Sequence, residues 1–243
     1  MRLGRLILLA LAACPMLCCA LRAEALTSEQ DTHEPIYAGV SGVTVLENPR
    51  VLVQRFIIQP GQSTGVHFHA GHRLMIVVKG GVLRSVDTRR STLWPDARVV
   101  WQDDHARRDA GSTNTGAAPI ELLWATIKPA SAAAAVAPAQ FGYLNYPNVP
   151  GEDLLENEWV IVQRFQLKPG QWEGVHAHNP NTFYIFIKGA HWLTKSKENP
   201  RGMPGSAADG LVAWMDPIDI GDEHQSGNIG TTTGDVVWVA LKQ

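Results

Sequence analysis

Two stretches of the chain each place a pair of histidines, one residue apart, behind a Pro-Gly turn. Residues 60–80 read PGQSTGVHFHAGHRLMIVVKG, and residues 169–189 read PGQWEGVHAHNPNTFYIFIKG. Alternate side chains of a β-strand point to the same face, so the two histidines of each pair face the same way. Two imidazoles on one face can chelate a divalent ion. Each stretch is therefore a candidate metal site.

The two stretches belong to a tandem repeat. Residues 48–81 align with residues 157–190 without a gap, and both histidines of each pair coincide. The end of each copy also matches, as ELLWATIK (121–128) and DVVWVALK (235–242). The aligned histidines are His67 and His69 in the first copy and His176 and His178 in the second.

The repeating unit is about 100 residues long, the size of a small domain and too long for a solenoid repeat. We expect residues 36–128 and 142–243 to form two domains. Between them, the segment 129–141 is rich in Ala and Pro, lacks a periodic pattern and is typical of a linker.

The elements that must hold the histidines are predicted to be β-strands. Apolar runs such as VTVLE and RLMIVVKGGVLRSV are short, β-branched and bounded by Gly, Pro or Asn, and none keeps a helical period over three turns. The sequence predicts an all-β protein with two small antiparallel barrels or sandwiches. Tryptophans that recur at paired positions, Trp101 with Trp214 and Trp124 with Trp238, indicate core packing.

Both copies resemble the cupin family. Its first motif, a glycine, five residues, H-x-H and a closing glycine, is matched after Gly61 and after Gly170, and His224 to Asn228 matches the H-x3-N end of its second motif. The resemblance implies a bicupin, with two antiparallel β-barrels of the double-stranded β-helix or jelly-roll type. It also implies a metal ion inside a barrel, held by the histidine pair, a glutamate and the later histidine.

The first copy departs from the family pattern at two positions. Arg73 stands where the motif has glutamate, and its permanent positive charge opposes a divalent cation and favours an anion. Counting back from the shared Asn-x-Gly places Ala110 opposite His224, while His105 could serve only if its loop reorganised. The weak candidate set of this copy is His67, His69 and His105.

The second copy keeps three histidines, and we take His176, His178 and His224 as its candidate metal ligands. Neutral imidazoles suit Fe, Mn, Zn, Cu or Ni and leave coordination positions open. Thr182 replaces the motif glutamate and could hydrogen-bond a bound water. A decayed site, whose histidines hydrogen-bond to one another, is the alternative.

Strand alternation places Thr182, Tyr184 and Phe186 on one inward face beside that site. Tyr184 is the catalytic candidate, as a hydrogen-bond donor or acid, although packing in a barrel explains it as well. The candidate substrate-binding residues are Arg73, Thr182 and Tyr184. Glu173 is expected to be a solvated loop carboxylate, and Trp192 has no motif support.

The N-terminal residues predict export. A basic start, a continuous apolar run and Ala23-Glu24-Ala25 form a secretory signal peptide over residues 1–25, too short for a stable membrane span. All three cysteines lie within it, so cleavage leaves no thiol. Cys14 also fits a bacterial lipoprotein pattern. The expected location is secreted or periplasmic.

Composition excludes some classes of function, and the motifs with the family resemblance leave two open. The 243 residues are 45% hydrophobic with a formal charge of −2, which suits globular domains and gives no sign of nucleic-acid binding. No later apolar run is long enough to cross a bilayer. One class is a metal-dependent, oxygenase-like enzyme acting on a small anionic organic substrate. The other is a non-catalytic small-molecule-binding or structural protein, and homo-oligomer formation stays open in both.

Overall fold

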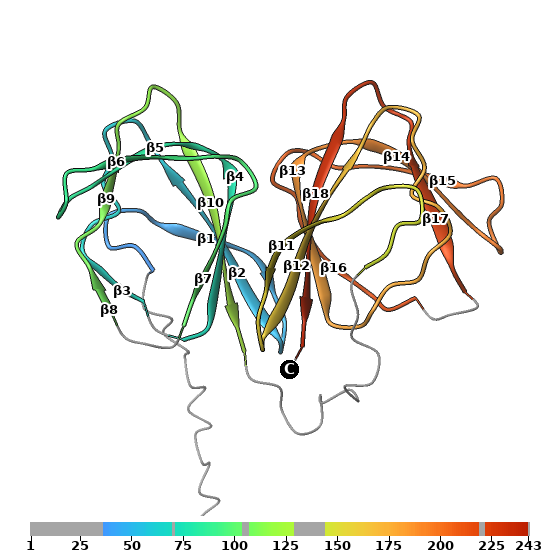
Figure 1. Ribbon diagram of the computed structural model, residues 1–243, viewed down its shortest axis with the longest axis horizontal. Helices are drawn as coiled ribbons and strands as arrows, with labels where there is room; N and C mark the ends of the chain where they lie inside the picture. Colours follow the sequence, from blue (N-terminus) through green and yellow to red (C-terminus); the bar gives the residue numbers. More distant parts are fainter. Residues whose placement is uncertain (1–35, 70, 104–106, 129–143, 219–221, 243) are drawn as a thin grey trace, which may run out of the picture. The chain divides into compact units, whose positions relative to one another are not determined.

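The computed structural model describes residues 36–69, 71–103, 107–128, 144–218 and 222–242. All regular elements in these ranges are β-strands, in two groups that correspond to the two sequence copies (Figure 1). We call these groups barrel 1 and barrel 2. The predicted all-β fold is confirmed.

Several sequence predictions concern residues outside the described ranges. These are the signal peptide 1–25 with Cys14, the linker 129–141 and His105. They stay predictions.

Barrel 1 contains strands β1 to β10, and every pairing between them is antiparallel. One sheet has the order β1-β2-β10-β4-β7, a second β6-β5-β9, and β3 pairs with β8. The strands are β1 (Gly42–Glu47), β2 (Val51–Ile58), β3 (His67–His69), β4 (Arg73–Lys79), β5 (Gly81–Ser85), β6 (Ser91–Trp94), β7 (Val99–Gln102), β8 (Arg107–Asp109), β9 (Ser112–Asn114) and β10 (Ile120–Ile127).

Barrel 2 repeats this plan with strands β11 to β18. Its five-stranded sheet has the order β11-β12-β18-β13-β16, which matches that of barrel 1 strand for strand, and it faces a sheet of order β15-β14-β17. The strands are β11 (Glu152–Glu156), β12 (Val160–Leu167), β13 (Thr182–Lys188), β14 (His191–Ser196), β15 (Met203–Ser206), β16 (Val212–Met215), β17 (His224–Asn228) and β18 (Gly234–Leu241).

The central strands of both large sheets are buried on two faces, which explains their continuous apolar sequences. In β13, Phe183 and Ile185 join a hydrophobic cluster shared with β2, β4 and β10 of barrel 1. The alternate residues Tyr184 and Phe186 point into barrel 2. The outer faces of the two five-stranded sheets therefore pack together, and their inner faces enclose separate interiors.

Candidate metal centre

Backbone pairing brings the three histidines of barrel 2 together. His176 and His224 exchange two backbone hydrogen bonds of 2.9 and 3.1 Å. His178 is fixed in the same way by Ile218, through two bonds of 3.1 Å. The segment before β13 is thus held against the start of β17 and the residues that precede it.

The imidazole rings of this cluster converge through their Nε2 atoms. His178 Nε2 lies 3.0 Å from His176 Nε2 and 3.2 Å from His224 Nε2. All three candidate ligand atoms lie within 4.8 Å of one another. The donor set fits a divalent transition-metal ion, because three nitrogen lone pairs can reach one point.

The protonation state of the cluster also suits metal binding. His176 Nδ1 donates to the Gly174 carbonyl at 2.8 Å, so its Nε2 carries the lone pair. Burial lowers the pKa of His176. Burial, helped by the neighbouring imidazoles, lowers the pKa of His178 to about 3 and that of His224 to about 4. The histidines are therefore neutral at physiological pH, and protons do not compete for the ligand atoms.

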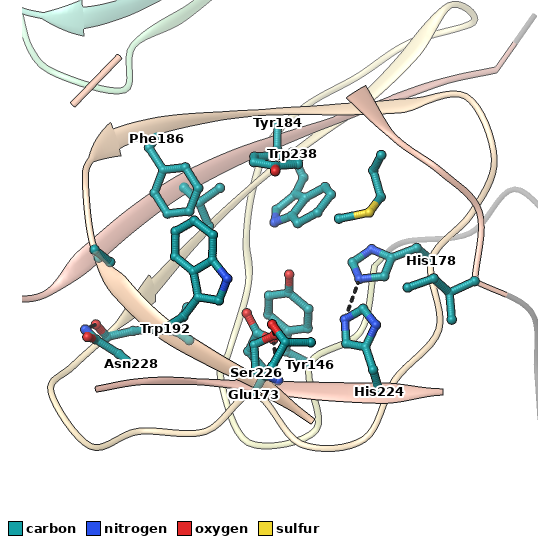
Figure 2. Close-up of a pocket in the computed structure, with 17 residues that line it drawn as sticks. Tyr146, Glu173, His178, Tyr184, Phe186, Trp192, His224, Ser226, Asn228 and Trp238 are labelled. Carbon is teal, nitrogen blue, oxygen red and sulfur yellow. Dashed lines mark hydrogen bonds between the residues drawn. The ribbon is translucent and has the colours of Figure 1, made fainter. Parts of the chain in front are cut away.

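A cavity of about 310 Å³ opens beside His178 and His224 (Figure 2). One side is an aromatic wall in which Phe186 stacks on Trp192, with ring centroids 5.3 Å apart and an interplanar angle of 5°. Tyr184 continues this wall. Trp192 had no motif to mark it in the sequence. It comes from β14, the strand that directly follows β13, and pairs there with Asn228 of β17.

Glu173 also lines this cavity, and the prediction that it is solvated was wrong. Glu173 is 9% exposed. Its backbone N–H donates to Ser226 O at 2.9 Å, which holds the residue against β17. Its Oε2 accepts from the Ser226 N–H at 3.2 Å and lies 3.9 Å from His176 Nε2. Burial raises the pKa of this carboxyl to about 8.

Tyr146 is a second site residue that motif reasoning missed. Its ring meets the His176 ring edge to face, with centroids 4.5 Å apart, and it lines the cavity. Burial raises its pKa well above the usual range. The repeat carries a signal for it, since Tyr37-x-x-Val40-x-Gly42 matches Tyr146-x-x-Val149-x-Gly151.

The structure separates the other predicted substrate-binding residues. Tyr184 lies in the cavity wall, and burial raises its pKa. Thr182 instead lies by a small separate cavity, with its hydroxyl donating to the carbonyls of Asn179 and Pro180. Arg73 begins β4 in barrel 1, opposite Gln102, and is not among the residues that line the large cavity.

The corresponding region of barrel 1 keeps the backbone plan but differs in its side chains. His67 Nδ1 donates to Gly65 O at 2.8 Å, as His176 does to Gly174. Asp109, however, pairs with His67 where His224 pairs with His176. The sequence alignment with Ala110 was wrong by one residue, because the chain inserts an extra residue here and Gly111 takes a positive φ of 93°.

Barrel 1 is also filled where barrel 2 is hollow. Met75 and Ile120 are buried in its inner cluster, at the positions of Tyr184 and Gly234 in barrel 2. Gly234 lines the cavity. The space therefore depends on which residues stand at equivalent points of the same backbone.

Comparison with solved structures identifies the fold. The chain matches AerE from Microcystis aeruginosa (TM-score 0.52, 11% identity, covering 85% of this chain and 99% of that one). It also matches salicylate 1,2-dioxygenase from Pseudoaminobacter salicylatoxidans (0.52, 9%, 85% and 75%) and a variant of oxalate decarboxylase from Bacillus subtilis (0.51, 12%, 83% and 72%). No family model matches the sequence, and no curated protein matches it.

The chain has the cupin fold twice, arranged as in bicupins. Its second barrel carries a histidine cluster of the kind that holds a metal ion. In the described part of the chain, no helix is long and apolar enough to cross a membrane.

Proposed function

We propose that barrel 2 binds one divalent metal ion through His176, His178 and His224, and that the protein is a metal-dependent, oxygenase-like enzyme. One observation carries this proposal. Three neutral Nε2 atoms converge within 4.8 Å beside a cavity large enough for a small organic molecule.

The proposed ion supplies Lewis acidity and, if it is Fe, Mn or Cu, redox chemistry at coordination positions that the protein leaves open. The residues of the chain bind the ion and position the substrate. The histidines hold the ion, and the cavity wall orients the substrate and excludes water. Tyr184 places a hydroxyl in this wall as a hydrogen-bond donor to the substrate.

The cavity lining favours a planar and largely apolar substrate. Phe186, Trp192, Tyr184 and Trp238 present rings to it, and neither Lys nor Arg is among the described residues that line it. The sequence suggested a small anionic substrate, and the metal ion would be the positive charge that attracts it. A hydroxylated or carboxylated aromatic compound that reaches the ion through oxygen meets both conditions.

A non-catalytic binding protein is the second candidate. Thr182 at the motif glutamate position favours it, because a missing carboxylate is also what a decayed centre would show. In this reading the same cavity holds a ligand without converting it.

Two measurements separate these functions. Elemental analysis of purified protein should find one Fe, Mn, Zn, Cu or Ni ion per chain. Oxygen consumption and product formation should then be followed with salicylate, gentisate and oxalate. Metal with turnover supports the enzyme, ligand binding without turnover supports the binding protein, and a protein that takes up no added metal contradicts the metal-binding proposal.

We also propose the domain boundaries and the location. Residues 36–128 and 142–243 form the two cupin domains, with 129–141 as the linker. The sequence of residues 1–25 supports export to the periplasm or beyond, with lipidation at Cys14 as the alternative processing route.

A further inference from the structure

We propose that Glu173 supplies a carboxylate ligand to the ion of the three-histidine centre, an inference that rests on the metal binding proposed above. The motif position for this carboxylate holds Thr182, whose hydroxyl is directed to backbone carbonyls. Glu173 comes from the other side of the histidine pair in sequence, yet its Oε2 is 3.9 Å from His176 Nε2. Figure 2 draws Glu173 with the residues that line the cavity, close to Ser226 and Tyr146.

The equivalent residue of barrel 1, Thr64, shows what the fold alone requires at this position. Thr64 N–H donates to Ser112 O at 2.9 Å, and its Oγ1 accepts from Ser112 N–H at 3.0 Å. Glu173 makes the same two contacts with Ser226, at 2.9 and 3.2 Å. A short neutral hydroxyl therefore satisfies the backbone, so the fold does not explain a charged side chain in barrel 2.

Glu173 needs a counter-charge at this buried position if it is to be ionised. An ionised carboxylate is costly to bury unless it is paired, hydrogen-bonded or bound to a metal. Its one ion-pair contact among the described residues is with His176, whose Nε2 lies 3.9 Å from Glu173 Oε2. Because no Lys or Arg is among the described residues lining the cavity, an ion at the histidine cluster is the positive charge that fits.

The distances are compatible with a shared ion. Ligand atoms at about 2.0–2.2 Å from one ion lie roughly 3 to 3.5 Å apart. The Nε2 separations of 3.0 and 3.2 Å already meet this condition. From its 3.9 Å separation, Oε2 must approach by about half an ångström, which a small side-chain rotation provides. With three neutral imidazoles, one carboxylate reduces the net charge of a divalent centre from two to one.

The test compares metal affinity in Glu173→Gln and Glu173→Thr with wild type. Both variants keep an oxygen that can accept from Ser226 N–H, and the second introduces the barrel 1 residue. Cobalt(II) is titrated into metal-free protein against a competing chelator, and the visible absorption of the bound ion is recorded. We expect affinity to fall at least ~10–100-fold in both variants, with a changed absorption spectrum. Glu152→Gln, an exposed Glu of the same barrel, should match wild type.

A Glu173→Gln protein that binds cobalt with wild-type affinity and an unchanged spectrum would overturn the inference, and Glu173 would then serve only as a backbone acceptor. If wild type itself binds no metal, the proposed function fails, which is a distinct result. Should the variants not fold, a crystal structure of metal-loaded wild type decides: Glu173 Oε2 at about 2.0–2.2 Å from the ion supports the proposal, and a separation beyond bonding distance overturns it.

Discussion

The cavity of barrel 2 should close when two of its residues are replaced by those at the equivalent positions of barrel 1. In barrel 1, Gly81 leaves room for Ile120, since a Cβ at Gly81 would lie 2.6 Å from Ile120 Cγ1. In barrel 2 the glycine stands at the other position of this pair: Ala190 takes the place of Gly81, and Gly234 takes the place of Ile120. A Cβ at Gly234 would lie 2.8 Å from the Ala190 Cβ. The double variant Ala190→Gly with Gly234→Ile therefore transfers the packing of the first barrel to the second.

The expected stability change follows from the area that becomes buried. A fully buried Ile contributes about 1.5–3 kcal/mol, while the lost Ala methyl removes about 0.8 kcal/mol. The backbone cost of Gly relative to Ala, roughly 0.5–1 kcal/mol, largely offsets between the two sites because one Gly is removed and one is added. The double variant should gain about 1–2 kcal/mol, or roughly 2–8 °C in Tm for a chain of this size.

The single variant Gly234→Ile provides the contrast. Its new side chain must enter against the Ala190 methyl, and such overpacking costs about 1–3 kcal/mol. Urea unfolding of metal-free wild type, the single variant and the double variant measures the coupling between the two sites. Metal binding should persist in the double variant, because no histidine changes, whereas binding of aromatic ligands to the cavity should be lost.

Two results would refute this reasoning. A single variant as stable as the double variant would show that Ala190 does not limit the space at position 234. A double variant less stable than wild type would show that the second barrel cannot accept the packing of the first.

Three further outcomes are expected. His176→Ala should abolish metal binding, while His67→Ala should leave it nearly unchanged, and elemental analysis measures both. Two ions per chain would contradict a single site in barrel 2, and loss of metal with His67→Ala would place the site in barrel 1. Metal-free protein should lose stability as pH falls below about 6.5, because the unfolded histidines protonate there whereas folded His178 and His224 do so near 3 and 4. Urea midpoints from pH 7 to 5 measure this, and a His178→Asn variant with an equally steep loss would contradict it. N-terminal sequencing of protein made in a Gram-negative host should find a start near residue 26, and an intact cytoplasmic Met1 would contradict it.

The fold could be predicted because its signals are local and repeated. Strand-length apolar runs ending at Gly or Pro, present twice, leave few architectures other than tandem barrels. The alternation of side chains along a β-strand also predicted that Tyr184 and Phe186 face the interior of the barrel, and the structure has them there. Thr182 belongs to the same series but lies outside the large cavity, because its hydroxyl is bound to the turn before β13.

The parts of the site that escaped prediction depend on long-range pairing. Glu173 looks like a loop residue until its backbone bond to Ser226 is known. The register of barrel 1 shifts at Gly111, so counting along the sequence selected Ala110 in place of Asp109. Neither effect has a local sequence signature strong enough to reveal it.

The comparison of the two barrels also separates residues that serve the fold from those that serve the site. The motif asparagines have the same role in both copies: Asn114 Nδ2 donates to Ile58 O at 2.9 Å, and Asn228 Nδ2 donates to Leu167 O at 2.8 Å. The first motif histidine binds a glycine carbonyl through Nδ1 in both copies as well. A matching H-x-H is therefore partly a structural signal and cannot by itself indicate metal.

The differences between the copies carry the functional information. Relative to barrel 1, barrel 2 has a histidine in place of Asp109, a glutamate in place of Thr64 and a glycine in place of Ile120. These three changes supply a third nitrogen ligand, a buried carboxyl group and an open cavity within a backbone plan that stays the same. The backbone at this position does not require a glutamate, because the smaller Thr64 satisfies it in barrel 1. The combination therefore favours a working metal centre in barrel 2.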